Sequence, residues 1–172
     1  GHYGLGKLIY LYDDNGITID GSTDLAYTED PTGRFEAYGW QVLHVADGND
    51  VDAIDAAIAE AKKESNRPTL IRVHTVIGYG SPNKEGTAGS HGAPLGDDEI
   101  MLTRERLGWV SDESFHVPDS VRSHMVSIGE RVASKRAAWE PMMQGYAQAH
   151  ADLYAQWNAW MSGALPDNLV SL

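Results

Sequence analysis

The sequence predicts an α/β fold in which a parallel sheet with crossover helices is followed by a helical C-terminal segment. Over the first half of the chain, short apolar runs alternate with segments of helical periodicity in the order strand, helix, strand, helix, strand. That order implies parallel strands joined by crossover helices. Towards the C-terminus, apolar residues recur at spacings of three, four or seven, which is typical of helices.

The first predicted strand, residues 8–12, is continuously apolar, which is typical of a strand buried on both faces of a parallel sheet. It ends at residues 13–16, whose sequence Asp-Asp-Asn-Gly has strong turn chemistry. A brief β-prone return over 17–19 is closed by Asp20 and Gly21.

Two helices and two further strands complete the predicted sheet. Asp30 and Pro31 suit the N-cap and first position of a helix that ends at Gly39. Asp50 caps a second helix with an apolar stripe on one face. The strands are expected at 41–46 and 68–75.

A glycine-rich loop with six glycines follows, from Gly78 to Gly96, and loops of this length are usually functional or mobile. Helices are expected at 97–107 and from 118 to about 126. The remainder reads as helical, with Pro141 restarting or kinking the run. The tryptophans of this region are expected to serve in helix packing.

Composition excludes several classes of function. The chain has 172 residues with 42% hydrophobic content, and 25 acidic against 13 basic residues give a net charge of −12, which disfavours nucleic acid as a partner. There is no cysteine, so disulfides, thiolate nucleophiles and Cys-zinc sites are excluded. With no apolar run of membrane-spanning length and no signal peptide, we expect a soluble cytoplasmic protein without membrane contacts.

Two places could bear chemistry. Asn15, in the turn after the first strand, offers an amide oxygen that suits a hard cation such as magnesium. The alternative is a turn whose Asp and Asn side chains only cap backbone donors. His91, flanked by glycines in the loop, could bind phosphate or move a proton, or it could be an incidental residue of a flexible surface loop.

Several stretches, in matching order and spacing, closely resemble the transketolase family of thiamine diphosphate enzymes. The resemblance covers nearly the whole chain, and the set is more specific than any single motif in it. It implies an incomplete thiamine diphosphate-binding fold, with thiamine diphosphate and magnesium as cofactors and calcium able to replace magnesium. The stretches are 4–9 (GLGKLI), 12–21 (YDDNGITIDG), 34–40 (RFEAYGW), 77–84 (IGYGSPNK) and 90–96 (SHGAPLG).

The resemblance also implies roles for individual residues. Asn15 would bind the metal through its amide, and with it the cofactor, while Ile17 would offer the metal its backbone carbonyl. His91 would be a catalytic residue that contacts both cofactor and substrate. Ile19 and Ile77 would be apolar walls beside the thiamine rings.

The chain departs from the family pattern in that the upstream histidines, the pyrimidine-binding domain and one metal-binding motif of the family are missing. No Gly-Asp-Gly motif, whose aspartate is a further metal ligand in the family, precedes Asn15. We therefore expect the C-terminal part of the diphosphate-binding domain, inactive by itself. The expected parts are a partial cofactor domain at 1–110, a helical extension at 111–163 and the start of an interdomain linker at 164–172.

For the parent enzyme, the resemblance implies transfer of a two-carbon ketol unit between sugar phosphates, in the pentose phosphate pathway. The partners would be the remaining transketolase segments and a second subunit in a homodimer-type assembly. Two alternatives stay open: another thiamine diphosphate enzyme resembling dihydroxyacetone synthase, and an inactive scaffold fragment that needs a partner chain.

Overall fold

A computed structural model describes residues 1–165 of the chain. The chain divides into two compact units, Gly1–Val110 and Ser111–Leu172. Most of the predicted linker, residues 166–172, lies outside the described residues.

The first unit is built on a three-stranded sheet in which every pairing is parallel. Strand β5 (Thr69–His74) lies between β1 (Ile9–Asp14) and β4 (Gln41–Val45). In the register, Asp14 of β1 lies opposite His74 of β5. The carboxyl ends of β1 and β5 therefore meet at one edge of the sheet, and the predicted parallel α/β fold is confirmed.

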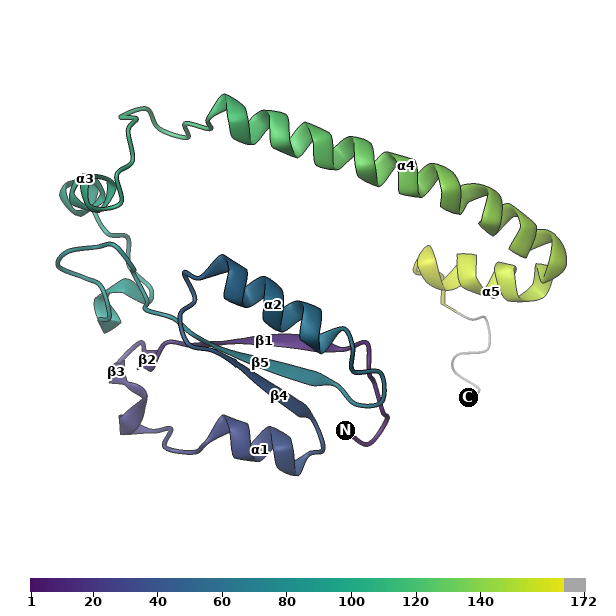
Figure 1. The fold of residues 1–172 in the computed structure, drawn as a ribbon, viewed down its shortest axis with the longest axis horizontal. Coiled ribbons are helices and arrows are strands. Elements are labelled where there is room, and N and C mark those ends of the chain that lie inside the picture. The colour runs from purple at the N-terminus through teal and green to yellow at the C-terminus, as the bar shows by residue number, and fades with distance from the viewer. Residues whose placement is uncertain (166–172) are drawn as a thin grey trace. The chain divides into compact units, whose positions relative to one another are not determined.

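Two helices cover opposite faces of this sheet, α1 (Pro31–Ala37) and α2 (Val51–Ala61) (Figure 1). Both begin at the predicted caps. The Asp30 carboxylate accepts hydrogen bonds from the backbone N–H groups at the start of α1, and Asp50 Oδ1 accepts one from Ala53 N at 2.9 Å. These bonds satisfy N–H groups that the first helical turn leaves unpaired.

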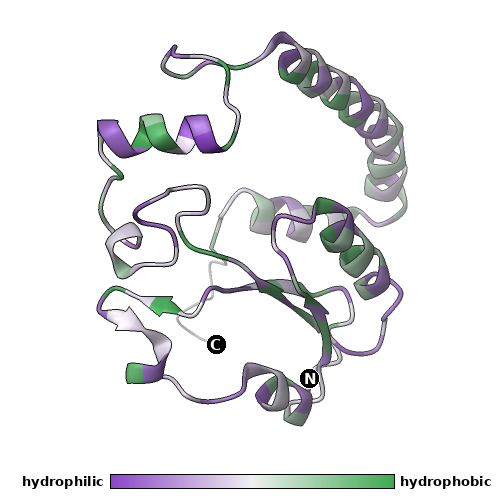
Figure 2. Ribbon diagram, turned by 60° about the vertical axis from the view of Figure 1, so that its left-hand side comes forward, coloured by the Kyte–Doolittle hydropathy of each residue, from purple (hydrophilic) through white to green (hydrophobic). Residues whose placement is uncertain are grey.

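The core lies between the sheet and α2. Ile71 of the central strand and Ala61 of α2 are fully buried, and Val45 and Val73 are almost so. Half-buried residues of α2 pack against this cluster, as its apolar stripe predicted. Hydrophobic residues are accordingly concentrated in the middle of the sheet and in α2 (Figure 2).

Strand β1 differs from the sequence prediction of burial on both faces. Tyr10 is 54% exposed and Leu11 is 52% exposed. The reason is that β1 is an edge strand of the sheet, while α2 packs on β4 and β5. Tyr10 gains only partial cover by stacking on Trp40, with 5.7 Å between the ring centroids.

The remaining elements of the first unit lie in the connections. The predicted β-prone return after β1 forms a hairpin of β2 (Ile17–Thr18) and β3 (Gly21–Ser22). The loop after β5 contains a short 3-10 turn, Ala88–Ser90, and leads into α3 (Asp97–Arg106) close to the predicted bounds.

The second unit contains two helices in contact with each other, α4 (Asp119–Ala149) and α5 (Ala151–Met161). Helix α4 runs through Pro141, so of the two effects predicted for this proline, a restart or a kink, the restart does not occur; a proline removes one hydrogen bond without abolishing the turns on either side. The chain leaves the helix at His150, with φ −140° and ψ 58°. No helix in residues 1–165 is both long and apolar enough to cross a membrane.

Two of the tryptophans predicted to pack, Trp139 and Trp157, meet between these helices, whereas Trp160 is 69% exposed. Trp139, Tyr146 and Trp157, with Met143, line a cavity of about 290 Å³. Trp139 is nevertheless 45% exposed and Trp157 is 41% exposed, so this cluster is only a partial core.

Candidate functional site

The carboxyl edge of the sheet joins the two segments that sequence analysis selected. The backbone N–H of Thr75, just after β5, donates to the Asp14 carbonyl at 3.3 Å, and the Thr75 hydroxyl donates to the Asp13 carboxylate. The turn at Asn15 and the glycine-rich loop therefore leave the sheet from neighbouring points. In open α/β sheets this edge is where ligands bind.

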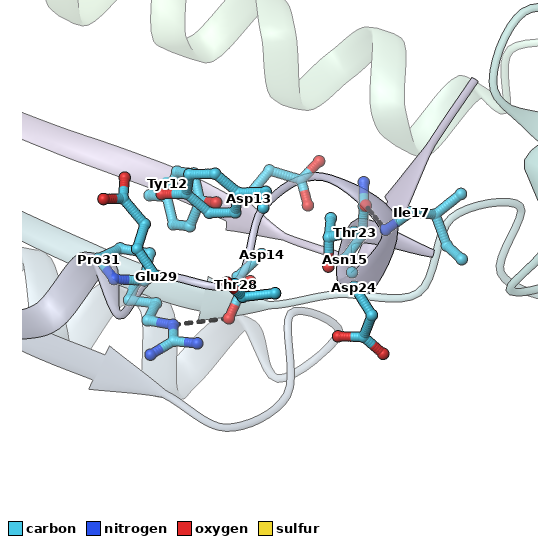
Figure 3. A pocket seen from close by; sticks show the side chains of 13 residues that line it. Tyr12, Asp13, Asp14, Asn15, Ile17, Thr23, Asp24, Thr28, Glu29 and Pro31 are labelled. Carbon is cyan, nitrogen blue, oxygen red and sulfur yellow. Dashed lines mark hydrogen bonds and ion pairs between the residues drawn. The ribbon is translucent and has the colours of Figure 1, made fainter. Parts of the chain in front are cut away.

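Asn15 is half-buried and caps the turn that begins the β2–β3 hairpin. Its Oδ1 accepts a hydrogen bond from Ile17 N at 2.9 Å (Figure 3). This is the backbone-capping role that the alternative interpretation assigned to it. An amide oxygen has two lone pairs, so this bond leaves Oδ1 able to contact a cation as well.

A cavity of about 330 Å³ opens beside this turn, and its walls are rich in oxygen atoms (Figure 3). Both residues predicted to bind the metal, Asn15 and Ile17, line it. So do four carboxylates and one guanidinium group. These charged groups belong to Asp13, Asp14, Asp24, Glu29 and Arg72.

The charge state of the wall follows from its hydrogen bonds. The Arg34 guanidinium is bonded to the Glu29 carboxylate and lowers the pKa of Glu29. Burial and the nearby Glu29 charge raise the pKa of Tyr27, another wall residue. At neutral pH Glu29 is therefore ionised and the Tyr27 phenol is neutral.

Sequence reasoning missed Arg72. Its Nε donates to Asp14 Oδ2 at 2.6 Å, and its Nη1 lies 3.3 Å from Thr32 Oγ1 and 3.5 Å from Asp30 Oδ1. The sequence contained a sign of this role, because Arg72 is the one charged residue within the run 68–73, whose other residues are buried. A cation in such a strand needs an anionic partner.

The other three predicted site residues do not line this cavity. Ile19 lies in the tip of the hairpin and is 72% exposed. Ile77 is half-buried, and its carbonyl accepts a hydrogen bond from Gly86 N at 2.8 Å. His91 is exposed and follows the 3-10 turn of the glycine-rich loop.

The glycine-rich loop itself lies beside the β2–β3 hairpin, beyond the strand ends, in both Figure 1 and Figure 2. The structure thus brings Asn15 and Ile17 together at the cavity. It places the loop that contains Ile77 and His91 next to the same hairpin.

The donor set at Asn15 suits a hard cation only in part. Amide and carboxylate oxygens are the ligands that magnesium prefers. Within residues 1–165, however, no three His, Cys, Asp or Glu side chains are grouped so that they could hold a metal ion. The described residues therefore fit a partial site, which other oxygen ligands would have to complete.

Comparison with known proteins adds an independent observation. Residues 1–166 match the family model described as the transketolase, thiamine diphosphate binding domain. The chain is 52% identical over 168 residues to a transketolase of Nostoc sp., and 48% identical over 168 residues to that of Geobacillus stearothermophilus. Each alignment covers 97% of this chain and 25% of the relative.

Solved structures agree. A transketolase of Pichia stipitis in complex with sedoheptulose-7-phosphate superimposes with a TM-score of 0.87 and 42% identity, over 98% of this chain and 25% of that one. The transketolase of Leishmania mexicana gives a TM-score of 0.88 at 36% identity, over 96% of this chain and 25% of that one. The chain thus spans about a quarter of the length of the relatives it matches.

Proposed function

Because this chain belongs to the transketolase family, we propose that it supplies part of the thiamine diphosphate and magnesium site of an enzyme that transfers a two-carbon ketol unit between sugar phosphates. The observation that supports this most directly is the position of Asn15. Its amide oxygen lies at the carboxyl edge of β1, in the wall of an acidic cavity, within a segment that matches the family throughout.

In this proposal the turn after β1 holds the metal. Asn15 contributes its amide oxygen and Ile17 its backbone carbonyl, and both are neutral donors. The diphosphate, water and the remaining segments of the enzyme supply the other ligands. Asn15 and Ile17 would hold a magnesium ion, or calcium in its place, whose charge would offset that of the diphosphate.

Thiamine diphosphate, when bound, supplies the carbanion chemistry of the transfer. The residues of this chain bind and orient. Ile19 at the hairpin tip and Ile77 at the start of the glycine-rich loop provide apolar surface for the thiamine rings and exclude water from them. His91 binds the diphosphate and holds or moves a proton at the oxygen atoms of the sugar substrate.

The same proposal includes the division of the chain and its partners. Residues 1–110 form the cofactor-binding part, 111–163 a helical extension and 164–172 the start of an interdomain linker. The chain acts with the remaining transketolase segments, in a homodimer-type assembly located in the cytoplasm, in the pentose phosphate pathway. By itself it is inactive.

A chimeric enzyme tests the proposal. The chain replaces the matching 168 residues of the Geobacillus stearothermophilus transketolase, to which it is 48% identical. We expect the chimera to bind thiamine diphosphate in the presence of magnesium and to transfer two carbons from xylulose 5-phosphate to an aldose phosphate. The chain alone should give no turnover.

The alternatives predict other results in the same assay. Preference for formaldehyde as the acceptor would favour an enzyme of the dihydroxyacetone synthase type. A chimera that is folded by circular dichroism and does not bind the cofactor would favour the inactive scaffold.

A further inference from the structure

A buried carboxylate outside the cavity joins helix α3 to the glycine-rich loop. Glu99, in the first turn of α3, is only 8% exposed. Its Oε1 accepts hydrogen bonds from the Ser81 hydroxyl and from Asn83 N, the latter at 2.8 Å, while its Oε2 accepts one from Asn83 Nδ2 at 2.9 Å. One side chain therefore satisfies three donors of the loop.

The chemistry of this group is that of a fixed anion. Hydrogen bonds from Ser81 and Asn83 lower the pKa of Glu99, so the side chain is ionised at neutral pH and can only accept. Its place in the first turn of a helix also favours negative charge. Among the described residues, no buried side-chain polar atom in this region lacks a partner.

The hydrogen bonds continue from Ser81 to Lys84. Lys84 N donates to Ser81 Oγ at 3.2 Å. The Lys84 carbonyl accepts a hydrogen bond from Ser90 Oγ at 2.7 Å, and Lys84 Nζ donates one to the Leu95 carbonyl at 2.8 Å. Ser90 directly precedes His91 and Leu95 follows it closely, so Lys84 holds the segment around His91 from both sides.

A second contact joins the end of α3 to the start of the loop. Glu85 Oε2 accepts a hydrogen bond from Gly80 N at 2.8 Å and lies 3.3 Å from Arg106 Nη2. The two limbs of the loop also approach closely, because a Cβ added to Gly78, whose φ is +66°, would lie 2.6 Å from Ser90 Oγ. The loop is thus fixed by α3 and by its own polar groups.

We propose that Glu99 is a positioning residue that sets the place of His91 through Ser81, Asn83 and Lys84. The proposal rests on the role given to His91 under the proposed function. Glu99 does not itself touch the ligand. It fixes residues 81–84, and Lys84 then fixes the segment 90–95.

Amide hydrogen exchange in the 172-residue chain tests the positioning, without cofactor or substrate. The reporters are the N–H groups of Gly86, Ser90 and His91, each hydrogen-bonded within the loop, and those of strand β5 serve as the reference for global unfolding. Glu99→Ala removes both acceptor oxygens and with them all three hydrogen bonds, and we expect about tenfold faster exchange at the reporters. Asp98→Ala is the control. It makes an equal change of charge at an exposed position of the same helical turn and should leave exchange at the reporters unchanged.

Glu99→Gln provides a conservative rescue. The glutamine keeps one oxygen as acceptor for the Ser81 hydroxyl and Asn83 N. Its side-chain NH₂ can donate to the Asn83 side-chain oxygen if the Asn83 amide flips by about 180°. Exchange at the reporters should therefore fall between the rates of the parent chain and Glu99→Ala. In the chimera, the matching expectation is a lower kcat together with weaker thiamine diphosphate affinity, because His91 is assigned contacts with both the diphosphate and the sugar substrate.

Three results would overturn the proposal. The first is unchanged exchange at the reporters in Glu99→Ala, and the second is faster exchange that is equal in β5, which would indicate general unfolding. The third is an unchanged kcat in a chimera whose loop exchange is accelerated. Failure of the proposed function is distinct, because the parent chimera would then bind no cofactor whatever the loop does.

Discussion

Arg72 of the central strand β5 donates through Nε to Oδ2 of Asp14 at the end of β1, at 2.6 Å. Both side chains are largely withdrawn from solvent, at 30% and 23% exposure. The pair joins two parallel strands immediately before Asn15, and Arg72 also reaches toward Asp30 and Thr32 at the start of α1. The turn that holds Asn15 is therefore fixed from the middle of the sheet.

Arg72→Met keeps the apolar stem and removes these bonds. We expect the free energy of unfolding to fall by about 1–2 kcal/mol, because a partly buried carboxylate loses a charged donor. Urea denaturation followed by circular dichroism measures the change. Arg136→Met is the control, since the Arg136–Glu140 pair lies at the surface and should change stability by less than about 0.5 kcal/mol. Equal losses in both variants would mean that Arg72 acts only as a surface charge.

Ile71→Ala tests the core. Ile71 is fully buried, so we expect its truncation to lower the free energy of unfolding by about 2–5 kcal/mol. Ile19→Ala removes the same atoms from the exposed hairpin tip and should have little effect on stability in the same urea titration. A large loss from Ile19→Ala would contradict the exposed position of this residue.

Asp50→Ala tests the cap of α2. The lost bond to Ala53 N should cost about 1 kcal/mol of stability, with the thermal midpoint falling accordingly. Asp55→Ala, an exposed substitution inside the same helix, should leave the midpoint nearly unchanged or raise it slightly, because alanine is the better helix former. A lower thermal midpoint in Asp55→Ala than in Asp50→Ala would contradict the capping role of Asp50.

Asn15→Ala, made in the chimera, tests the metal ligand. We expect magnesium-dependent affinity for thiamine diphosphate to fall by at least about tenfold, measured by calorimetry. Asn49→Ala is the matched control, because Asn49 follows another strand of the same sheet, β4, and does not line the cavity. Asn15→Asp keeps both an acceptor for Ile17 N and an oxygen atom that can bind the metal, so it should retain most of the affinity that Asn15→Ala loses. Unchanged affinity in Asn15→Ala would contradict the assignment.

The contribution of Glu99 to stability should depend on pH. Its pKa is lowered in the folded chain, so its hydrogen bonds stabilise the fold above the ordinary carboxyl pKa, and this stabilisation is lost as the pH falls through the lowered value. The stability difference between the parent chain and Glu99→Gln should therefore be constant from about pH 6 to 8 and shrink below about pH 4. Urea titrations at these pH values measure it. A stability difference that grows as the pH falls would contradict the lowered pKa of Glu99.

The sequence predicted the sheet well where local signals agreed. Asp50, the apolar stripe of α2 and the strands predicted at 41–46 and 68–75 all indicated one βαβ unit, and the structure has it. The burial of β1 could not be predicted in this way, because apolar composition reveals the environment that a strand prefers and not its place in the sheet order. Pro141 misled for a related reason: a proline weakens a long helix without having to end it.

The site was predictable to a lesser extent. Asn15 was found because a turn of oxygen-bearing residues follows an apolar strand, and it does lie in a cavity wall. Glu99 was missed because Asp97, Asp98 and Glu99 read as an ordinary acidic start of a helix. Only the three-dimensional structure distinguishes the one carboxylate that faces the loop from its exposed neighbours.

The bracing of the glycine-rich loop by α3 has a consequence for binding thermodynamics. Ordering a free backbone costs about 1–2 kcal/mol per residue, and here folding has already imposed that order on the loop. A ligand that docks beneath it would meet a preorganised surface, with little loss of conformational entropy on association. Substitutions in α3 that release the loop would then weaken the affinity for such a ligand, although α3 is far along the chain from Asn15. The reason is that each binding event would have to order the loop anew.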